Sequence, residues 1–410
     1  MTSPGKPSAG GLRIIVMGYV VRGPLGGLTW HHLQYLMGLA ALGHCTHFLE
    51  DSDDYPSCYD PVRGVTDSDP AYGLSYATEV FKRSGFGERW AYHDAHTGRW
   101  HGPRAGDILR LCSEADVLLN VSGVNPLRPW VRGIPARALI DTDPVFTQIR
   151  HLKDPAAMAR AAAHTAFFTF GENFGQPDCT IPDDGLRWIA TRQPIVLDAW
   201  PLRPPAVEGR FTSVMQWESY AEAEHLGERY GMKSLSFQPY VSLPSRVRPR
   251  LELALGGEGA PRSELLAQGW AIRDPLELTR DPWTYQDYIQ GSRGEFAIAK
   301  HGYVVSASGW FSERSAAYLA SGRPVIAQET GFSRWLERTG GVLSFANPDE
   351  ARASISAVDA DYASHSRNAR AVAAEFFDAS KILSRLIDLA VATTAGSEEP
   401  VAPSRADLQK

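Results

Sequence analysis

Short apolar runs alternate with segments of helical period along most of the chain. Leu12–Tyr19 is a continuous apolar run, which is typical of a strand buried on both faces of a parallel sheet. A glycine-rich loop, 22–27, follows it, and Thr29–Leu42 then carries apolar residues on one helical face. Cys45–Leu49 is the next apolar run. This order of strand, loop, helix and strand predicts the opening of a doubly wound α/β domain.

The same alternation predicts three further strands in the first half, at Ala115–Val121, Ala136–Ile140 and Thr165–Phe170. Residues 51–105 are rich in Asp, Tyr, Gly and Pro, and we interpret them as a loop-rich insertion that borders a cleft. Gln193–Trp200 is the last element expected before a proline-rich linker that begins at Pro201.

The second half repeats the α/β rhythm. Its expected strands are Phe211–Gln216, Leu251–Leu255, Trp270–Ile272, Glu295–Ala299, Val325–Ala327 and Val342–Phe345. Its expected helices are Ser263–Gln268, Thr284–Gln290, one within 308–324, Phe332–Arg338, a long one over Asp349–Phe377, and Ser380–Val391. We therefore divide the chain into a flexible leader (1–11), an N-terminal α/β domain (12–200), a linker (201–210), a C-terminal α/β domain (211–378), a C-terminal helix (379–395) and a disordered tail (396–410).

Composition excludes several classes of protein. A chain of 410 residues with 43% hydrophobic and 21% charged residues is typical of a folded two-domain protein, and its net charge of −6 gives no general reason to bind nucleic acid. The four cysteines are scattered, no signal sequence opens the chain and no run spans a membrane, so we expect a cytoplasmic protein with reduced thiols. GxGxxG, the P-loop, HExxH and Cys/His clusters are all absent, so neither an NAD cofactor nor a metal is predicted.

The most informative segment is Ser308–Pro324, SGWFSERSAAYLASGRP. A small-residue loop precedes a helix there, and an apolar strand follows Pro324. The first amides of a helix have no partner within the helix, and together with the helix dipole they suit a phosphate group. The alternative is an ordinary strand-to-helix turn in which Ser312 is a plain N-cap.

The run GWFSERSAAYLASGRPVIAQETGF resembles the donor-site segment of GT-B glycosyltransferases, most strongly over Ser292–Phe345. The resemblance implies two Rossmann-like domains that face each other across a cleft. The C-terminal domain would bind a nucleoside diphosphate sugar as co-substrate, and the N-terminal domain would bind a small-molecule acceptor.

The resemblance also implies roles for individual residues. The diphosphate would lie against the turn formed by Ser308, Gly309, Ser312, Glu313 and Arg314. Lys300 and Arg293 would add positive charge. The alternative for each is an ordinary solvated position on the surface. Glu329 and Thr330 would contact the sugar, and Arg273 would lie near the base and ribose.

Inverting GT-B enzymes often carry a catalytic histidine early in the first helix, and His31 occupies that place. Histidine titrates near neutrality, so it suits the role of general base. His32 points about 100° away around the helix, so only one of the two faces the cleft. Asp141 or Asp143 would orient the imidazole, or would make an Asx-turn before Pro144. Gly26, Gly27 and Trp30 lie beside His31 and are expected at the acceptor side, with core packing as the alternative for the tryptophan.

Two patterns bear on the mechanism. Asp-x-Asp, the metal-binding pair of GT-A enzymes, occurs four times and is therefore unspecific. The E-x7-E pair of retaining GT-B enzymes is missing. Eight residues after Glu295 the chain has Tyr303, and eight residues after Glu313 it has Ser321, so neither glutamate has a second glutamate at the required spacing. We therefore expect a metal-independent, inverting hexosyltransferase. The alternatives are a nucleotide-sugar epimerase on the same fold and a non-catalytic, GT-B-shaped partner protein.

Overall fold

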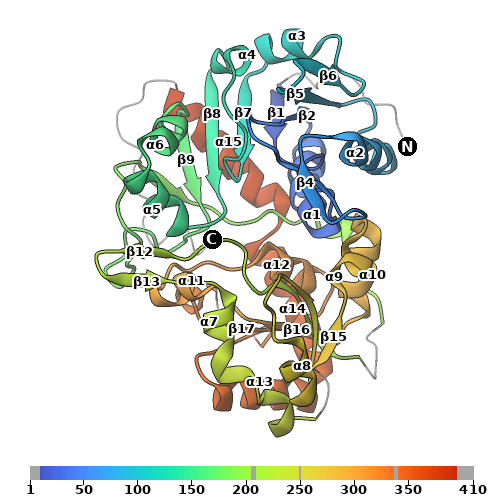
Figure 1. The fold of residues 1–410 in the computed structure, drawn as a ribbon, viewed down its shortest axis with the longest axis vertical. Coiled ribbons are helices and arrows are strands. Elements are labelled where there is room, and N and C mark those ends of the chain that lie inside the picture. The colour runs from blue at the N-terminus through green and yellow to red at the C-terminus, as the bar shows by residue number, and fades with distance from the viewer. Residues whose placement is uncertain (1–9, 205–208, 249–250, 337–339, 395–410) are drawn as a thin grey trace.

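The computed structural model describes residues 10–204, 209–248, 251–336 and 340–394. The predicted leader, linker and tail lie wholly or partly outside these ranges. Figure 1 shows two layered α/β halves, the N-terminal one above the C-terminal one.

The larger sheet belongs to the N-terminal half. Its strands run in the order β10 (Trp188–Ala190), β9 (Ala166–Thr169), β8 (Ala136–Asp141), β7 (Val117–Val121), β1 (Arg13–Met17), β2 (Cys45–Asp51), β5 (Trp90–Asp94) and β6 (Arg99–His101). β6 pairs antiparallel with β5, and the other pairs are parallel. Ile14 and Val16 face one hydrophobic cluster, while Ile15 and Met17 face another. Burial on both faces explains why β1 is apolar from Ile14 to Met17.

The second sheet is parallel throughout. Its order is β15 (Ala271–Arg273), β14 (Leu251–Gly256), β11 (Phe211–Gln216), β16 (Gly294–Ala297), β17 (Val325–Gln328) and β18 (Val342–Phe345). Two small hairpins lie outside the sheets, β3 (Cys58–Asp60) with β4 (Val65–Asp67), and β12 (Ala223–His225) with β13 (Glu228–Tyr230). The doubly wound α/β fold expected from the sequence is confirmed.

Helices cover both sheets. In the N-terminal half they are α1 (Gly26–Ala41), α2 (Ala71–Arg83), α3 (Ile108–Ser113), α4 (Pro129–Arg132), α5 (Phe146–Lys153), α6 (Pro155–Ala162) and the 3₁₀ turn η1 (Leu197–Ala199). In the C-terminal half they are α7 (Lys233–Phe237), η2 (Gln238–Tyr240), η3 (Leu243–Arg246), α8 (Arg262–Ala267), α9 (Pro275–Thr279), α10 (Pro282–Gly291), α11 (His301–Val305), α12 (Glu313–Ala320), η4 (Phe332–Arg334), α13 (Pro348–Ala360) and α14 (Tyr362–Phe376). The last helix, α15 (Ala379–Thr394), packs on the N-terminal half.

Two of the predicted elements are wrong. Residues 51–105 are not mainly loop, because they contain α2 and two strands of the main sheet, β5 and β6. The long helix expected over 349–377 is two helices, α13 and α14, that meet at Asp361. Asp361 has an extended φ of −139°, and its side chain accepts a hydrogen bond from the Ser364 amide. It therefore starts a new helix instead of continuing the old one.

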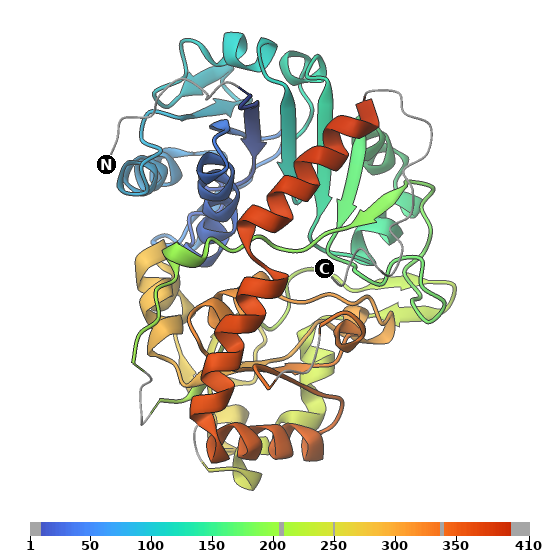
Figure 2. The same ribbon diagram turned by 180° about the vertical axis from the view of Figure 1, so that it is seen from behind.

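The chain crosses between the halves twice, and the two crossings lie side by side. The Ile195 amide donates to the Phe377 carbonyl at 2.7 Å, and the Ala379 amide donates to the Ile195 carbonyl at 2.9 Å. After the second crossing α15 returns to the N-terminal half and packs against α1, β7, β8 and β9 (Figure 2). The last helix therefore completes the N-terminal core.

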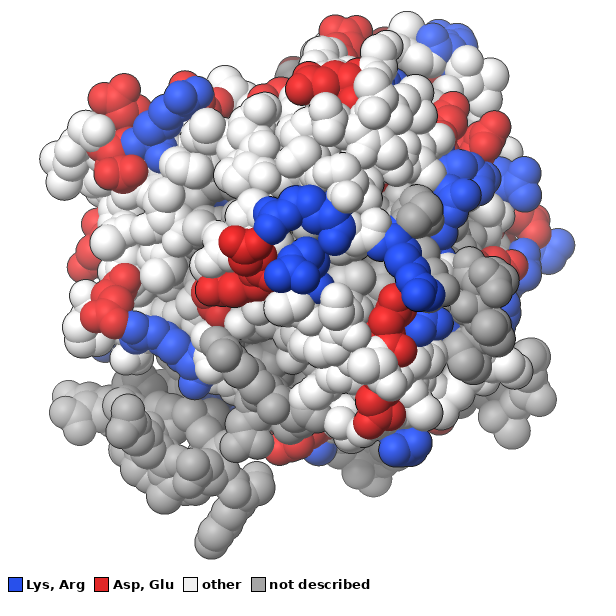
Figure 3. All heavy atoms as spheres, turned by 90° about the horizontal axis from the view of Figure 1, so that it is seen from below, with Lys and Arg blue, Asp and Glu red and all other residues white. Residues whose placement is uncertain are grey.

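Charges of both signs are mixed on the surface. Figure 3 shows basic and acidic side chains next to one another on the lower face of the molecule. Ion pairs with exposed partners, such as Arg110 with Glu114, contribute little to stability. Within the described residues, no helix combines the length and apolar character needed to cross a membrane.

We expect Leu383→Ala in α15 to lower the free energy of unfolding by about 2–5 kcal/mol, because the side chain is fully buried against α1. Val391→Ala on the same helix is the control, since Val391 is 38% exposed and should change the value by roughly 0.5 kcal/mol or less. Urea unfolding measures both. Equal effects of the two substitutions would show that α15 is not part of the N-terminal core.

Candidate functional site

The amino end of α12 opens on the seam between the two halves. Gly309 has a left-handed φ of 74° that suits glycine, and it turns the chain toward the helix. Ser312 is the N-cap, and its hydroxyl accepts a hydrogen bond from the Arg314 amide at 3.2 Å. The predicted loop, cap and helix are therefore in place at the carboxyl edge of the second sheet.

Three cationic side chains converge near this helix end. Lys300 follows β16 and caps α11, Lys233 begins α7, and Arg314 lies in the first turn of α12. Burial, followed by the charges of Arg314 and Lys300, lowers the pKa of Lys233 from its ordinary value to about 7. Cations close enough to lower the pKa of Lys233 mark a place suited to an anion.

Sequence reasoning missed Lys233. It follows a short hairpin in a segment without a recognisable motif. Lys233 matters because it lies near Lys300 and Arg314. These two residues follow it in the chain by 67 and 81 positions, and only the fold brings them near it. No local signal would have found it.

Each of the other two cations has a carboxylate partner. Arg314 pairs with Glu295 of β16 and donates to the Val214 carbonyl at 2.7 Å. Lys300 crosses the seam, and its Nζ lies 2.8 Å from Asp143 Oδ1 in the N-terminal half. The hydroxyls of Tyr220 and Tyr303 also donate to Asp143. Asp143 thus occupies the position of an anion against Lys300.

Asn173 makes a second contact across the seam. Its side-chain amide donates to the carbonyls of Ala307 at 2.9 Å and Gly331 at 3.0 Å. A Cβ on Gly309 would come within 2.7 Å of the Asn173 side chain, and one on Gly331 within 2.5 Å. The two glycines are therefore required for the close approach of the two halves.

His31 faces α12 from the N-terminal half. It lines a 20 Å³ cavity together with Gln34 and Trp200, and with Glu313 and Arg314 from α12. His31 Nε2, Gln34 Nε2 and Trp200 Nε1 are buried and have no hydrogen-bond partner among the described residues. Burial lowers the pKa of His31 to about 4, so the imidazole is neutral at pH 7. The fold thus brings His31 to the same cavity as Glu313 and Arg314, and its role as a base stays a prediction.

The predicted orientation of His31 by an aspartate is wrong. The Asp141 carboxylate accepts hydrogen bonds from Thr147, Gln148 and Thr169, and burial raises its pKa. It also accepts from the Asp143 amide at 2.9 Å, which is the Asx-turn given as the alternative. Since Asp143 bonds to Lys300 and two tyrosines, neither carboxylate contacts the imidazole.

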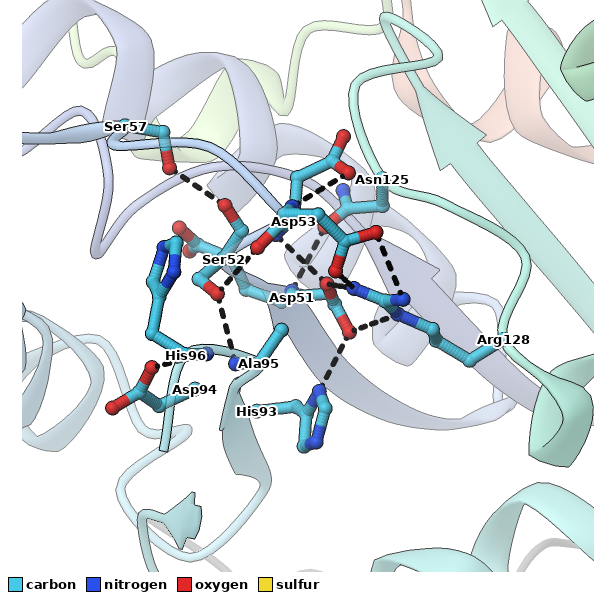
Figure 4. Close-up of polar contacts among 12 residues, drawn as sticks. Asp51, Ser52, Asp53, Ser57, His93, Asp94, Ala95, His96, Asn125 and Arg128 are labelled. Carbon is cyan, nitrogen blue, oxygen red and sulfur yellow. Dashed lines mark hydrogen bonds and ion pairs between the residues drawn. The ribbon is translucent and has the colours of Figure 1, made fainter. Parts of the chain in front are cut away.

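A further polar cluster lies at the carboxyl ends of β2 and β5 (Figure 4). Asp51 accepts from His93 Nδ1 at 2.8 Å and from Arg128 Nε at 3.1 Å. Asp53 instead pairs with Arg160 at 2.7 Å. One of the four Asp-x-Asp pairs is thus saturated by cations, and the described residues contain no group of three or more potential ligands arranged for a metal ion.

The two sheets, with their carboxyl ends turned to a common seam, match known structures over nearly the whole chain. An α-glucosyltransferase in complex with UDP-glucose and DNA containing an abasic site aligns with a TM-score of 0.56 at 11% identity, covering 93% of this chain and 100% of that one. Anabaena HepE in complex with UDP and glucose aligns with a TM-score of 0.53 at 11% identity, covering 93% of this chain and 100% of that one. Sucrose-phosphate synthase from Thermosynechococcus elongatus aligns with a TM-score of 0.51 at 12% identity, covering 94% of this chain and 100% of that one. The chain has the GT-B fold. No family model and no curated protein matches the sequence.

Within the GT-B frame, one of the predicted donor residues lies away from the seam. Arg293 precedes β16, so it lies at the amino end of that strand, where it pairs with Asp359 at 2.7 Å and stacks on Tyr362. Its assignment to the donor site is therefore wrong. Arg273 ends the edge strand β15 and is exposed, with Glu277 at 3.9 Å as an ion-pair partner.

Glu329 and Thr330 lie in the loop after β17, as predicted, but internal contacts occupy most of their polar atoms. Glu329 Oε1 accepts from the Gly331 amide at 2.7 Å, and Thr330 donates to the Trp310 carbonyl at 2.6 Å. Glu329 Oε2 is buried without a partner in the part of the chain described.

Ser308 is also engaged internally. Its hydroxyl donates to the Tyr303 carbonyl at 3.3 Å and accepts from the Trp310 amide at 3.2 Å, while its carbonyl accepts from the Asn173 amide. Ser308 therefore shapes the loop before α12.

Gly26, Gly27 and Trp30 make a helix contact across the seam instead of an open acceptor loop. A Cβ on Gly26 would lie 2.3 Å from the Asp281 carbonyl oxygen, and Gly27 packs on the Tyr285 ring. The Trp30 indole donates to the Pro282 carbonyl at 2.7 Å. These residues hold α1 against α10, and Gly27 and Trp30 also line the cavity of His31, so their place at the acceptor stays a prediction.

We expect Asp143→Asn to increase the affinity for inorganic pyrophosphate roughly tenfold, which corresponds to about 1.4 kcal/mol. The substitution removes the carboxylate that competes for Lys300 but keeps its shape. Calorimetric titration measures the change, with Asp183→Asn as the control because Asp183 is exposed and lies outside the seam contacts. An unchanged or weaker affinity would show that Asp143 does not compete with an anion.

Proposed function

We propose that this protein is a glycosyltransferase that moves a sugar from a nucleoside diphosphate donor to a small-molecule acceptor. The observation that carries the proposal is the convergence of Lys233, Lys300 and Arg314 on the amino end of α12. A diphosphate there would offset the mutual repulsion of the cations and accept hydrogen bonds from free amides of the helix. The GT-B fold supports this assignment by analogy.

We propose UDP-hexose as the donor. Two of the similar structures contain UDP-glucose, or UDP with glucose. One of them also contains DNA. For this chain we favour a small hydroxyl-bearing acceptor, because the net charge is −6 and charges of both signs are mixed on the face in Figure 3.

We propose direct displacement with inversion, with His31 as the base and without a metal ion. The acceptor oxygen would bond to the anomeric carbon as the bond from that carbon to the diphosphate breaks. The acceptor proton would pass to His31 Nε2, and Lys233, Lys300 and Arg314 would balance the charge that grows on the leaving diphosphate.

The proposed base is supported by its place and its protonation state. Its Nε2 is unpartnered among the described residues and faces the first turn of α12. A pKa of about 4 keeps the ring neutral but makes it a weak base. A bound diphosphate would raise this pKa, because a nearby negative charge favours the imidazolium form. Donor binding would thereby activate His31. We propose that the reaction takes place in the cytoplasm, in keeping with the four free cysteines.

UDP should raise the melting temperature more than ADP or GDP does, because a ligand that binds only the native state stabilises it by mass action. Lys233→Met and Ser312→Ala should each weaken UDP binding roughly tenfold. Exposed Lys153→Met is the control for the lost charge. Calorimetry from pH 6 to pH 8, a range chosen to bracket the pKa of about 7, should show affinity falling as Lys233 loses its proton, and Lys233→Met should flatten this dependence. Failure of every nucleoside diphosphate to bind would overturn the donor site.

His31→Gln should reduce the transfer rate on the order of a hundredfold or more and leave UDP affinity within a factor of about two. The assay follows UDP release from UDP-glucose with pooled small hydroxyl acceptors, with and without EDTA, and NMR gives the anomeric configuration of the product. Exposed His96→Gln is the matched control. A product with the same anomeric configuration as the donor would contradict inversion. Loss of activity with EDTA would contradict metal independence.

A further inference from the structure

The N-terminal half contains a cavity of about 310 Å³ that the donor site does not use. Its floor is the carboxyl ends of β7 and β8, with Leu139 and Asp141, and its wall comes from α5 and α6. Small-molecule sites usually measure roughly 300–1,000 Å³. The cavity also lies beside β7 and β1, where the strand order of the sheet reverses, which is where open α/β sheets bind ligands.

Strained backbone surrounds this cavity. Asp53 and Ser122, which line it, have left-handed φ values of 60° and 63°. Val145, which precedes α5, has a φ of 70°, and this conformation is a genuine outlier for a β-branched residue. Specific bonds hold the conformation, such as the Val145 amide to Gln148 Oε1 at 2.7 Å. Strain maintained by local contacts in this way is a feature of binding sites.

One histidine on the cavity wall is held in a fixed orientation. His151 Nδ1 lies 2.7 Å from Asp184 Oδ2, and Asp184 Oδ1 accepts from the Trp188 indole at 2.9 Å. A carboxylate oxygen only accepts, so Nδ1 carries a proton and Nε2 is left for a hydrogen bond with a ligand. Within the described residues, no group donates to this Nε2. His151 is therefore set to accept a hydrogen bond from a ligand hydroxyl.

The rest of the lining is polar, and its three aspartates outnumber its two arginines by one. Arg160 pairs with Asp53, and Asp141 is saturated by hydroxyl and amide donors. Arg150 and Asp154 contribute one charge of each sign. Alanines of α6 supply a small apolar surface. Donors, acceptors, an apolar patch and a small net charge match a neutral molecule rich in hydroxyl groups.

We propose that this cavity binds the acceptor, a neutral polyhydroxylated molecule of about monosaccharide size, and that His151, positioned by Asp184, accepts a hydrogen bond from one of its hydroxyls. The inference rests on the proposed glycosyl transfer. The cavity is close to the donor side, because Asp141 in its lining bonds to the Asp143 amide, and Asp143 contacts Lys300.

Saturation-transfer NMR on the UDP-loaded protein tests this proposal with four probes: glucose, N-acetylglucosamine, myo-inositol and glucuronate. At least one neutral probe should bind, and Ala156→Trp should weaken it roughly tenfold, because Ala156 is an exposed residue on the cavity lining. Ala159→Trp is the control, since Ala159 is exposed on the same helix but does not line the cavity. His151→Phe should also weaken binding, with the melting temperature confirming that each variant is folded.

The two proposals fail in different ways. Binding of glucuronate alone, binding of no probe, or equal affinities in Ala156→Trp and Ala159→Trp would overturn the acceptor site, even if UDP binds normally. Loss of UDP binding in the wild-type protein would instead overturn the donor site and the transfer reaction.

Discussion

The close approach of the two halves at Asn173 is the constraint on which the site depends. Its side-chain amide bonds to two carbonyls of the opposite half, and Gly309 and Gly331 leave the space that it fills. Any side chain at either glycine would force the loops apart. With the loops in place, Lys300 reaches Asp143 and the end of α12 faces His31. The chemistry therefore follows from backbone geometry at two glycines.

The distribution of charge at the seam has the same origin. Taking cations out of water is unfavourable unless an anion compensates them. Glu295 compensates Arg314, and Asp143 compensates Lys300. Lys233 instead has a lowered pKa, which favours its neutral form and so reduces the cost of burying it. With Glu313 in the first turn of α12, three carboxylates lie beside the three cations, and an external anion would compete with Asp143 for Lys300.

Local rules predicted what depends on local structure. Ser312 as N-cap, the end of its helix at Gly322 and the buried strand β1 all follow from short-range patterns. β5 was missed because its His93 and Asp94 belong to polar networks that interrupt the apolar pattern. The sequence already contained the reason why Arg293 cannot lie at the donor site. It precedes a parallel strand, and such a residue lies at the edge of the sheet opposite the ligand. Lys233 and the partner of Asp143 depend on long-range contacts, which periodicity does not encode.

The paired crossings at Ile195 and Asp378 have a mechanical consequence. Two separate connections between two bodies restrict how they move, and here the connections are hydrogen-bonded to each other at one place. Relative motion of the halves is thereby reduced to rotation about a single pivot. Trp200, five residues from the pivot, would move little, whereas a contact remote from the pivot would part widely during opening. A cut in either connection alone would leave the halves joined by the other, so the protein is protected against separation by a single proteolytic event.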